Sequence, residues 1–204
     1  MLREHLAHLI REQPGMEICG ETDNAPSALD LILRTQPDIA IVDISLRGTS
    51  GLELIKDIKS RGITVPVLVL SMHDENLYAE RALRAGARGY ITKNEASSVV
   101  IEAIRTVLMG GVYVSSQLAA KIIKRVAIGG AAQAGQSGMD LLADRELEVF
   151  ELIGSGRTVR EIAELLNLGE STVDTYRARI KEKLGLRTAA EVVLRAGQWV
   201  KDRN

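Results

Sequence analysis

The sequence has few aromatic residues, one cysteine and almost no net charge. Only 3% of its 204 residues are aromatic although 46% are hydrophobic, so any core must be mainly aliphatic. The single cysteine, Cys19, excludes an internal disulfide bond and fits a reducing compartment. A net charge of −1 gives no overall field that would attract nucleic acid or an anionic membrane, so a basic binding site must be local.

Long apolar runs are also missing. No run approaches the length of about 20 residues that a membrane-spanning helix requires. The first residues mix histidine, arginine and glutamate with leucine, which is not the pattern of a secretory signal. We therefore expect a soluble cytoplasmic protein without a membrane partner, and the chain is long enough for two small domains.

The first half of the chain alternates short apolar runs with amphipathic helical patterns. Strands are expected at residues 16–21, 39–43, 65–71 and 87–92. This alternation favours an α/β unit with parallel strands and helices on both faces of the sheet. From Leu141 onward only helical periodicity remains. The expected organisation is an α/β unit at 1–111, a linker with a short helix at 112–139, and a small all-α unit at 140–204.

Two capping patterns mark helix starts in the second half. Thr158 with Glu161, and Ser171 with Asp174, have the spacing of a capping box. A tight turn at Gly169 separates the two helices. Two short helices joined in this way are typical of a helix-turn-helix motif.

The second of these helices is expected to have a buried stripe and a polar face. At about 100° per residue, the stripe consists of Val173, Tyr176, Ile180 and Leu184. Small polar side chains on the opposite face suit base edges, and flanking cations suit phosphates beside the major groove. The candidate DNA-binding residues are Thr158, Ser171, Thr172, Asp174, Thr175, Arg177, Ala178, Arg179, Lys181 and Lys183.

The charge pattern leaves a second interpretation open. Helices with alternating charge are common, and these side chains could merely solvate an exposed face. From Arg177 to Arg187, however, five cations accompany a single acid, Glu182. Positive charge is therefore concentrated where the helix would meet DNA.

Residues 141–193, LLADRELEVFELIGSGRTVREIAELLNLGESTVDTYRARIKEKLGLRTAAEVV, resemble the LuxR-type helix-turn-helix domain. The resemblance rests on the pair Arg145-Glu146, the step Ile162-Ala163, STVDTYRARI and the exit KLGL. Ala143 departs from the family, which commonly has threonine there as the cap of the first helix; its loss should fray the helix end without abolishing the fold. The resemblance implies a fourth helix, from about Thr188, that often pairs two such domains on DNA.

Polar residues stand at the expected ends of three strands. These are Asp43, Ser71 and, just past the last strand, Lys93. Reactive groups of parallel sheets gather beyond the carboxyl ends of the strands. A carboxylate nucleophile with a hydroxyl and an ammonium group suits the capture of a phosphoryl group. Each residue alone also has a structural explanation, as a turn, a helix cap or plain surface.

Residues 4–111 resemble a response-regulator receiver domain, and the whole chain resembles a two-component regulator of the NarL/FixJ family. The resemblance implies a flavodoxin-like, doubly wound parallel sheet followed by the small all-α helix-turn-helix domain. It also implies a sensor histidine kinase, double-stranded promoter DNA and a second copy of the chain as partners. By position, Asp43 is the phosphoacceptor, Ser71 the switch hydroxyl, Tyr90 the switch aromatic and Lys93 the conserved-type lysine.

The sequence departs from the receiver pattern at its start. Family members begin with a strand that ends in two acids, and those acids hold the Mg²⁺ that phosphoryl transfer requires. This sequence opens with a helical pattern, so the receiver lacks its first strand and Asp43 is the one expected metal ligand. Leu46-Arg47 is a second departure, where the family usually has Met-Pro. We expect weak Mg²⁺ binding and poor phosphorylation of this chain.

Three explanations of the missing strand are open. The natural start lies upstream of Met1, so that this sequence is truncated; or the sheet closes up or borrows a strand from a partner; or the protein is a regulator that works without phosphate. In the family's strand order the missing strand lies in the middle of the sheet, so its loss would remove a large part of the core.

Rival functions fit the residues less well. A haloacid-dehalogenase-type phosphatase needs a second aspartate two residues after Asp43, where the chain has Ser45. A flavin-binding fold needs a hydroxyl-rich loop after a first strand, and that region is absent. A protein-interaction module whose C-terminal helices bind another protein stays open, and the salt dependence of DNA affinity separates it from a DNA binder. The sequence therefore predicts a DNA-binding transcription regulator that is not an enzyme and is controlled by phosphorylation of Asp43. The alternative is an atypical, phosphorylation-independent regulator of the same family.

Overall fold

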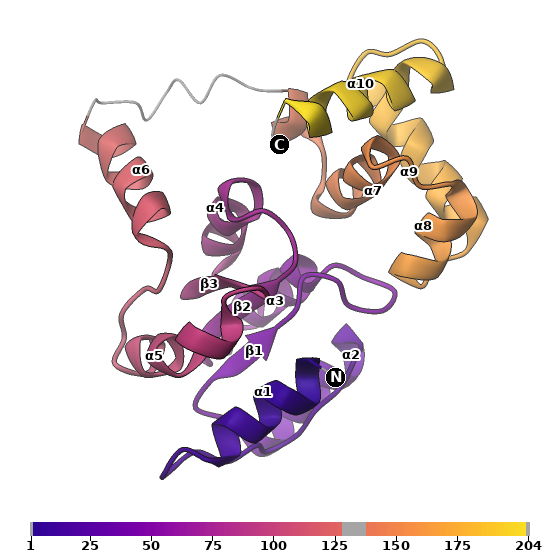
Figure 1. Ribbon diagram of the computed structural model, residues 1–204. Helices are drawn as coiled ribbons and strands as arrows, with labels where there is room; N and C mark the ends of the chain where they lie inside the picture. Colours follow the sequence, from indigo (N-terminus) through magenta and orange to yellow (C-terminus); the bar gives the residue numbers. More distant parts are fainter. Residues whose placement is uncertain (1, 128–137, 203–204) are drawn as a thin grey trace. The chain divides into compact units, whose positions relative to one another are not determined.

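The computed structural model describes residues 2–127 and 138–202, which belong to two compact units divided after Ala127. Figure 1 shows both units. The glycine-rich part of the expected linker, residues 128–137, lies outside the described residues. In the described parts of the chain, none of the helices combines the length and apolar character needed to cross a membrane.

The first unit combines helices with a three-stranded parallel sheet (Figure 1). Its elements are α1 (Leu2–Arg11), α2 (Ala25–Thr35), β1 (Ala40–Val42), α3 (Gly51–Ser60), β2 (Val67–Ser71), α4 (Glu75–Ala85), β3 (Gly89–Thr92), α5 (Ala96–Leu108) and α6 (Ser116–Ala127). The strand order is β1-β2-β3. Val42 pairs with Val69, and Ser71 pairs with Thr92, so the three strands end at the same edge of the sheet. The predicted α/β architecture is confirmed.

Apolar side chains on the sheet fix the helices around it. Leu68 and Leu70 of β2 are buried in one cluster with Leu6 of α1 and Ile104 of α5. Each such side chain contributes about 2 kcal/mol when it leaves water. Helices α3 and α4 contact each other, and α4 contacts β3. The strand ends thus lie on a packed scaffold.

Residues 16–21 do not form the predicted strand. They have no regular structure, and their side chains are exposed or half-buried. Within residues 2–127 and 138–202, no strand pairs with this segment. A strand without a neighbour leaves its backbone donors and acceptors to water. Within the described residues β1 is consequently an edge strand of the sheet.

The short helix expected within residues 112–139 is α6, and its contacts group it with the first unit. The segment before it lies along β3, because the backbone N–H of Tyr90 donates to the carbonyl oxygen of Tyr113 at 2.8 Å. The Glu75 carboxylate in α4 accepts from the backbone N–H of Ser115 at 2.9 Å. These bonds connect α6 to both β3 and α4.

The second unit consists of helices over residues 138–202, as predicted. Its elements are the 3-10 helix η1 (Gly138–Leu141), α7 (Asp144–Gly154), α8 (Val159–Leu166), α9 (Glu170–Lys183) and α10 (Ala189–Lys201). A buried ion pair joins Arg145 to Glu148 at 2.5 Å, and Arg145 also donates to the Leu166 carbonyl oxygen at 2.9 Å. The ring of Trp199 in α10 packs against Phe150 in α7, with centroids 5.6 Å apart.

One of the two predicted capping boxes forms. The Thr158 hydroxyl accepts from the backbone N–H of Glu161 at 3.3 Å, and the Glu161 carboxylate accepts from the backbone N–H of Thr158 at 2.8 Å. Hydrogen bonds from the Thr158 backbone and hydroxyl, with the charge of Arg157, lower the pKa of Glu161. The second prediction is wrong, because α9 is capped by the extended backbone of Gly169 and already includes Ser171.

Ala143 is the N-cap of α7 and forms half of a capping box. The Glu146 carboxylate accepts from the backbone N–H of Ala143 at 2.7 Å and from Nζ of Lys183 at 2.6 Å. Alanine has no side-chain oxygen for the N–H groups of the first turn. The start of α7 is thus held by only one of the two hydrogen bonds of a capping box.

Replacement Ala143→Thr should stabilise the second unit by about 1 kcal/mol, because its hydroxyl would complete the capping box. Urea denaturation followed by Trp199 fluorescence measures this, since the chain has one tryptophan and it lies in the second unit. Ala143→Val is the matched control, with a similar shape and no acceptor. Equal unfolding midpoints for the threonine and valine variants would contradict the capping explanation.

Candidate functional sites

The predicted strand-end residues meet at the carboxyl edge of the sheet. Asp43 follows β1, Ser71 ends β2 and Lys93 follows β3. The ammonium group of Lys93 forms an ion pair with the Asp43 carboxylate. The backbone N–H of Lys93 donates to the Ser71 carbonyl oxygen at 2.7 Å. The side chains of Asp43 and Lys93 are 30% and 20% exposed, so a small anion can reach them while solvent screens the pair only partly.

Backbone geometry holds the Asp43 carboxylate in place. One carboxylate oxygen accepts from the backbone N–H of Ser45 at 3.1 Å. The chain then returns, and the start of α3 lies against the Asp43 peptide. A Cβ atom at Gly51 would lie 2.0 Å from the Asp43 carbonyl oxygen, so this close approach requires glycine.

Both switch candidates, Ser71 and Tyr90, form hydrogen bonds with the backbone of His73, which follows β2. The fully buried hydroxyl of Ser71 accepts from the backbone N–H of His73 at 3.1 Å. Tyr90 is 1% exposed, and its hydroxyl donates to the carbonyl oxygen of His73 at 2.8 Å. The imidazole Nε2 lies 3.1 Å from the Ser45 hydroxyl, and the imidazole ring contacts Tyr78 with centroids 4.4 Å apart.

His73 and Ser45 belong to the cluster although the sequence pattern did not indicate them. Each stands two positions after a predicted strand-end residue, Ser71 or Asp43. In extended backbone a spacing of two returns a side chain to the same side. This spacing is the one sequence feature that could have identified His73 and Ser45, but it predicts little unless the loop geometry is known.

The cluster fits a magnesium site poorly. Mg²⁺ requires near-octahedral oxygen coordination, whereas here one oxygen of Asp43 faces Lys93 and the other accepts from Ser45. An ammonium group at this place also repels a divalent cation. Across residues 2–127 and 138–202, no three histidine, cysteine, aspartate or glutamate side chains gather closely enough to hold a metal ion.

Two acids near the cluster have other partners. Asp23 binds the guanidinium group of Arg47 at 3.1 Å, and its carbonyl oxygen accepts from the Arg47 backbone N–H at 3.0 Å. Asp74 caps α4 by accepting from the backbone N–H of Asn76 at 2.8 Å. The Leu46-Arg47 step thus ties its loop to the segment before α2.

Helix α9 exposes most of its candidate DNA-binding residues. Val173 and Ile180 are fully buried, whereas Tyr176 and Leu184 are half-buried. The buried stripe is therefore narrower than predicted. The exposed candidates on α9 are Ser171, Thr172, Asp174, Thr175, Ala178, Arg179 and Lys183, while Arg177 and Lys181 are half-buried.

The cations of α9 differ in their partners. Arg177 forms an ion pair with Asp174 at 2.9 Å, and Lys183 forms one with the buried Glu146 at 2.6 Å. Arg179 and Lys181 have no acidic partner within residues 138–202. On α9, Arg179 and Lys181 therefore carry the positive charge that remains available for a ligand.

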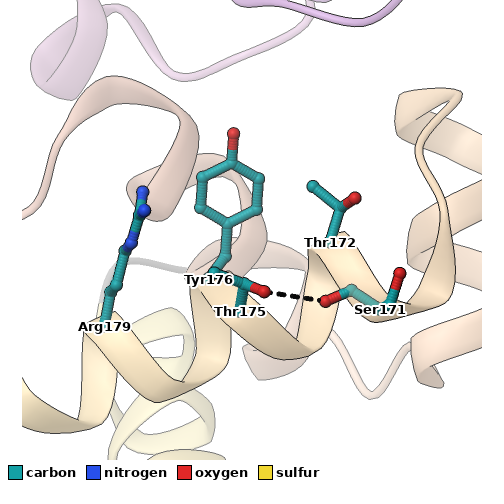
Figure 2. A pocket seen from close by; sticks show the side chains of 5 residues that line it. All are labelled: Ser171, Thr172, Thr175, Tyr176 and Arg179. Carbon is teal, nitrogen blue, oxygen red and sulfur yellow. Dashed lines mark hydrogen bonds between the residues drawn. The ribbon is translucent and has the colours of Figure 1, made fainter.

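A pocket opens along one side of α9, as Figure 2 shows. It is lined by Ser171, Thr172, Thr175, Tyr176 and Arg179. The side chains of Thr172, Tyr176 and Arg179 point to the same side of the helix (Figure 2). The hydroxyl of Thr175 donates to the carbonyl oxygen of Ser171 at 2.9 Å. The spacing of Tyr176 from Val173 and Ile180 predicts a core position, but its side chain is half-buried and lines the pocket.

Thr158 is the candidate that lies outside α9. Its hydroxyl donates to the Glu161 carboxylate at 2.8 Å and belongs to the capping box of α8. The capping box gives this threonine a structural task independent of DNA.

Comparisons with known proteins match both units. Residues 1–105 match the response regulator receiver domain, and residues 140–196 match the luxR family of bacterial regulatory proteins. The chain is 31% identical to the transcription regulator of virulence factors BvgA from Bordetella pertussis over 185 residues, which cover 91% of this chain and 87% of BvgA. A two-component response regulator of the LuxR family from Aurantimonas sp. SI85-9A1 is 31% identical, with a TM-score of 0.57 over 62% of this chain and 90% of that chain.

A third likeness concerns the fold. RcsB from Salmonella enterica serovar Typhimurium, in a structure bound to promoter rprA, has a TM-score of 0.56 at 19% identity, over 93% of this chain and 90% of that chain. The receiver match covers about half of the chain, and the second match covers the helical unit. The chain thus belongs to the NarL/FixJ-type response regulators, which join a receiver domain to a LuxR-type helix-turn-helix domain, and it is a DNA-binding transcription regulator.

Proposed function

We propose that Asp43 accepts a phosphoryl group from a sensor histidine kinase and that this event controls promoter binding by the second unit. The observation that carries the proposal is the ion pair between Asp43 and Lys93 beside Ser71, at one edge of the parallel sheet. The carboxylate would attack phosphorus, and the ammonium and hydroxyl groups would stabilise the phosphoryl oxygens. The chain would thus be the substrate of the kinase, in the cytoplasm, and not an enzyme.

His73 offers a route from the phosphoryl group to the surface. A phosphoryl group on Asp43 would draw the Ser71 hydroxyl away from the backbone N–H of His73. Because Tyr90 donates to the carbonyl oxygen of the same residue, its position would change as well. The backbone of Tyr90 is bonded to Tyr113, next to α6. The altered surface around α4, β3 and α5 would then pair with a second copy of the chain.

A second candidate function is regulation without phosphate. Two observations favour it: Lys93 neutralises Asp43, and the cluster fits Mg²⁺ poorly. In that case the ion pair would act as a permanent structural link between β1 and β3. We propose that these residues bind Mg²⁺ weakly and that phosphorylation of Asp43 is therefore slow. One phosphorylation experiment can distinguish the two functions.

Incubation with acetyl phosphate and MgCl2 should phosphorylate the chain slowly, and Asp43→Asn should abolish the product. The rate should rise with MgCl2 without saturating in the millimolar range, because the cluster supplies a single carboxylate that already faces Lys93. Phosphate-affinity gel electrophoresis measures the product. Rapid labelling that saturates at low Mg²⁺ would contradict weak metal binding, and absence of labelling at every Mg²⁺ concentration would favour the second function.

For the second unit we propose that α9 enters the major groove of promoter DNA. The exposed side chains of Asp174, Thr175 and Ala178 would face base edges, and Arg179 and Lys181 would contact phosphates on the two sides. Arg177 and Lys183 would contribute less, because their charges are paired within the unit. The fold likeness to a regulator whose structure is bound to a promoter supports DNA as the ligand.

The two faces of α9 can be separated by substitution. Arg179→Ala should weaken binding about tenfold on every DNA sequence, because a phosphate contact carries no base information. Thr175→Ala should change base preference instead, and since its hydroxyl donates to Ser171, the contact would come from the methyl group or an oxygen lone pair. Fluorescence anisotropy on selected and random duplexes measures both effects. Arg177→Ala is the matched control, with a smaller expected loss because of its ion pair.

Equal losses for the Thr175 and Arg179 variants on all sequences would show that the faces of α9 are assigned wrongly. An affinity that does not fall with salt concentration would argue against DNA as the ligand altogether.

A further inference from the structure

We propose that the pocket on α9 receives one phosphate of the DNA backbone and that Tyr176 is thereby a DNA-positioning residue. This contact rests on the proposed entry of α9 into DNA. It adds Tyr176, whose spacing predicts a core position, to the residues that contact DNA. The site consists of Thr172, Tyr176 and Arg179, with Ser171 and Thr175 at its border.

The three central side chains form a row along the helix. Tyr176 stands four residues after Thr172 and three before Arg179, a spacing that places all three within one side of an α-helix. Val173 and Ile180 anchor the adjacent side in the core, because both are fully buried. Tyr176 is half-buried, and its hydroxyl points away from α9 (Figure 2).

The chemistry of the row suits a phosphate. The five residues that line the pocket include no acid. The guanidinium group of Arg179 has no acidic partner within residues 138–202, and it offers a fork of donors that matches phosphate oxygens. The hydroxyls of Tyr176 and Thr172 are further donors, whereas the proton of Thr175 is used by the Ser171 carbonyl oxygen.

The position of the row favours a phosphate over a base edge. The face proposed to read bases is centred on Asp174, Thr175 and Ala178, and the pocket lies on one flank of that face. The walls of the major groove are the two phosphate backbones, so a flank of an inserted helix meets phosphates. The pocket also lies beside the first turn of α9, where the positive end of the helix dipole is located. This end of a helix favours a nearby negative charge.

The decisive variant is Tyr176→Phe in the complete chain, because it removes one hydroxyl and keeps the ring. Fluorescence anisotropy would compare a duplex selected with the unaltered chain and a random duplex of equal length. We expect about tenfold weaker binding to both, the loss typical of one hydrogen bond to a charged group. Unchanged affinity would overturn the proposal, and so would a loss confined to the selected duplex, since that pattern indicates a base contact.

The salt dependence tests whether Tyr176 and Arg179 bind the same phosphate. Arg179→Gln should lower the slope of log affinity against log salt by about one. Tyr176→Phe should leave the slope unchanged, because the lost hydroxyl is neutral. In the double variant the losses should be smaller than the product of the two single losses, as for groups that share a partner. Independent losses would contradict a shared phosphate.

Two controls separate this proposal from the proposed function. Lys201→Gln removes an exposed cation at the end of α10 and should change affinity much less. The fluorescence of Trp199 and the urea midpoint should match the unaltered chain, which shows that the second unit remains folded. If the unaltered chain binds neither duplex, DNA binding itself fails and the pocket assignment with it. If it binds and Tyr176→Phe binds equally well, the pocket assignment alone fails.

Discussion

The parallel register of β1, β2 and β3 is the constraint on which the first unit depends. Because Val42 pairs with Val69 and Ser71 with Thr92, the three strands end at one edge and deliver their next side chains to the same place. The ion pair between Asp43 and Lys93 is a direct consequence of this register. A slip of one residue in either strand pair would turn these side chains to the other face of the sheet.

The second unit uses paired and unpaired charges for different purposes. Lys183 and Glu146 hold α9 against α7, and Arg177 is paired with Asp174 along the helix. Arg179 keeps its charge available for a ligand at the edge of the pocket. Some cations of α9 thus stabilise the fold, while others remain available for DNA. A simple count of cations along the helix therefore overstates the positive charge available to phosphates.

Local patterns in the sequence were sufficient for much of the fold. Hydrophobic periodicity identified the helices and the three observed strands, because each element buries one face and its side chains must repeat at the period of its backbone. The capping box of Thr158 and Glu161 was also predictable, since both partners lie within one turn. The strand-end positions of Asp43, Ser71 and Lys93 followed from strand boundaries alone.

Local sequence patterns therefore indicate which segments are helical or extended, and which polar residues end the strands. Whether an extended segment has a neighbouring strand depends on packing, and residues 16–21 have none, so they form no strand. Packing also fixes the rotation of helices. In α9, Val173 and Ile180 fill the core, which leaves Tyr176 at the surface. The pairing of a strand and the rotation of a helix about its axis both depend on packing between segments that are distant in the chain. Local periodicity does not predict such packing.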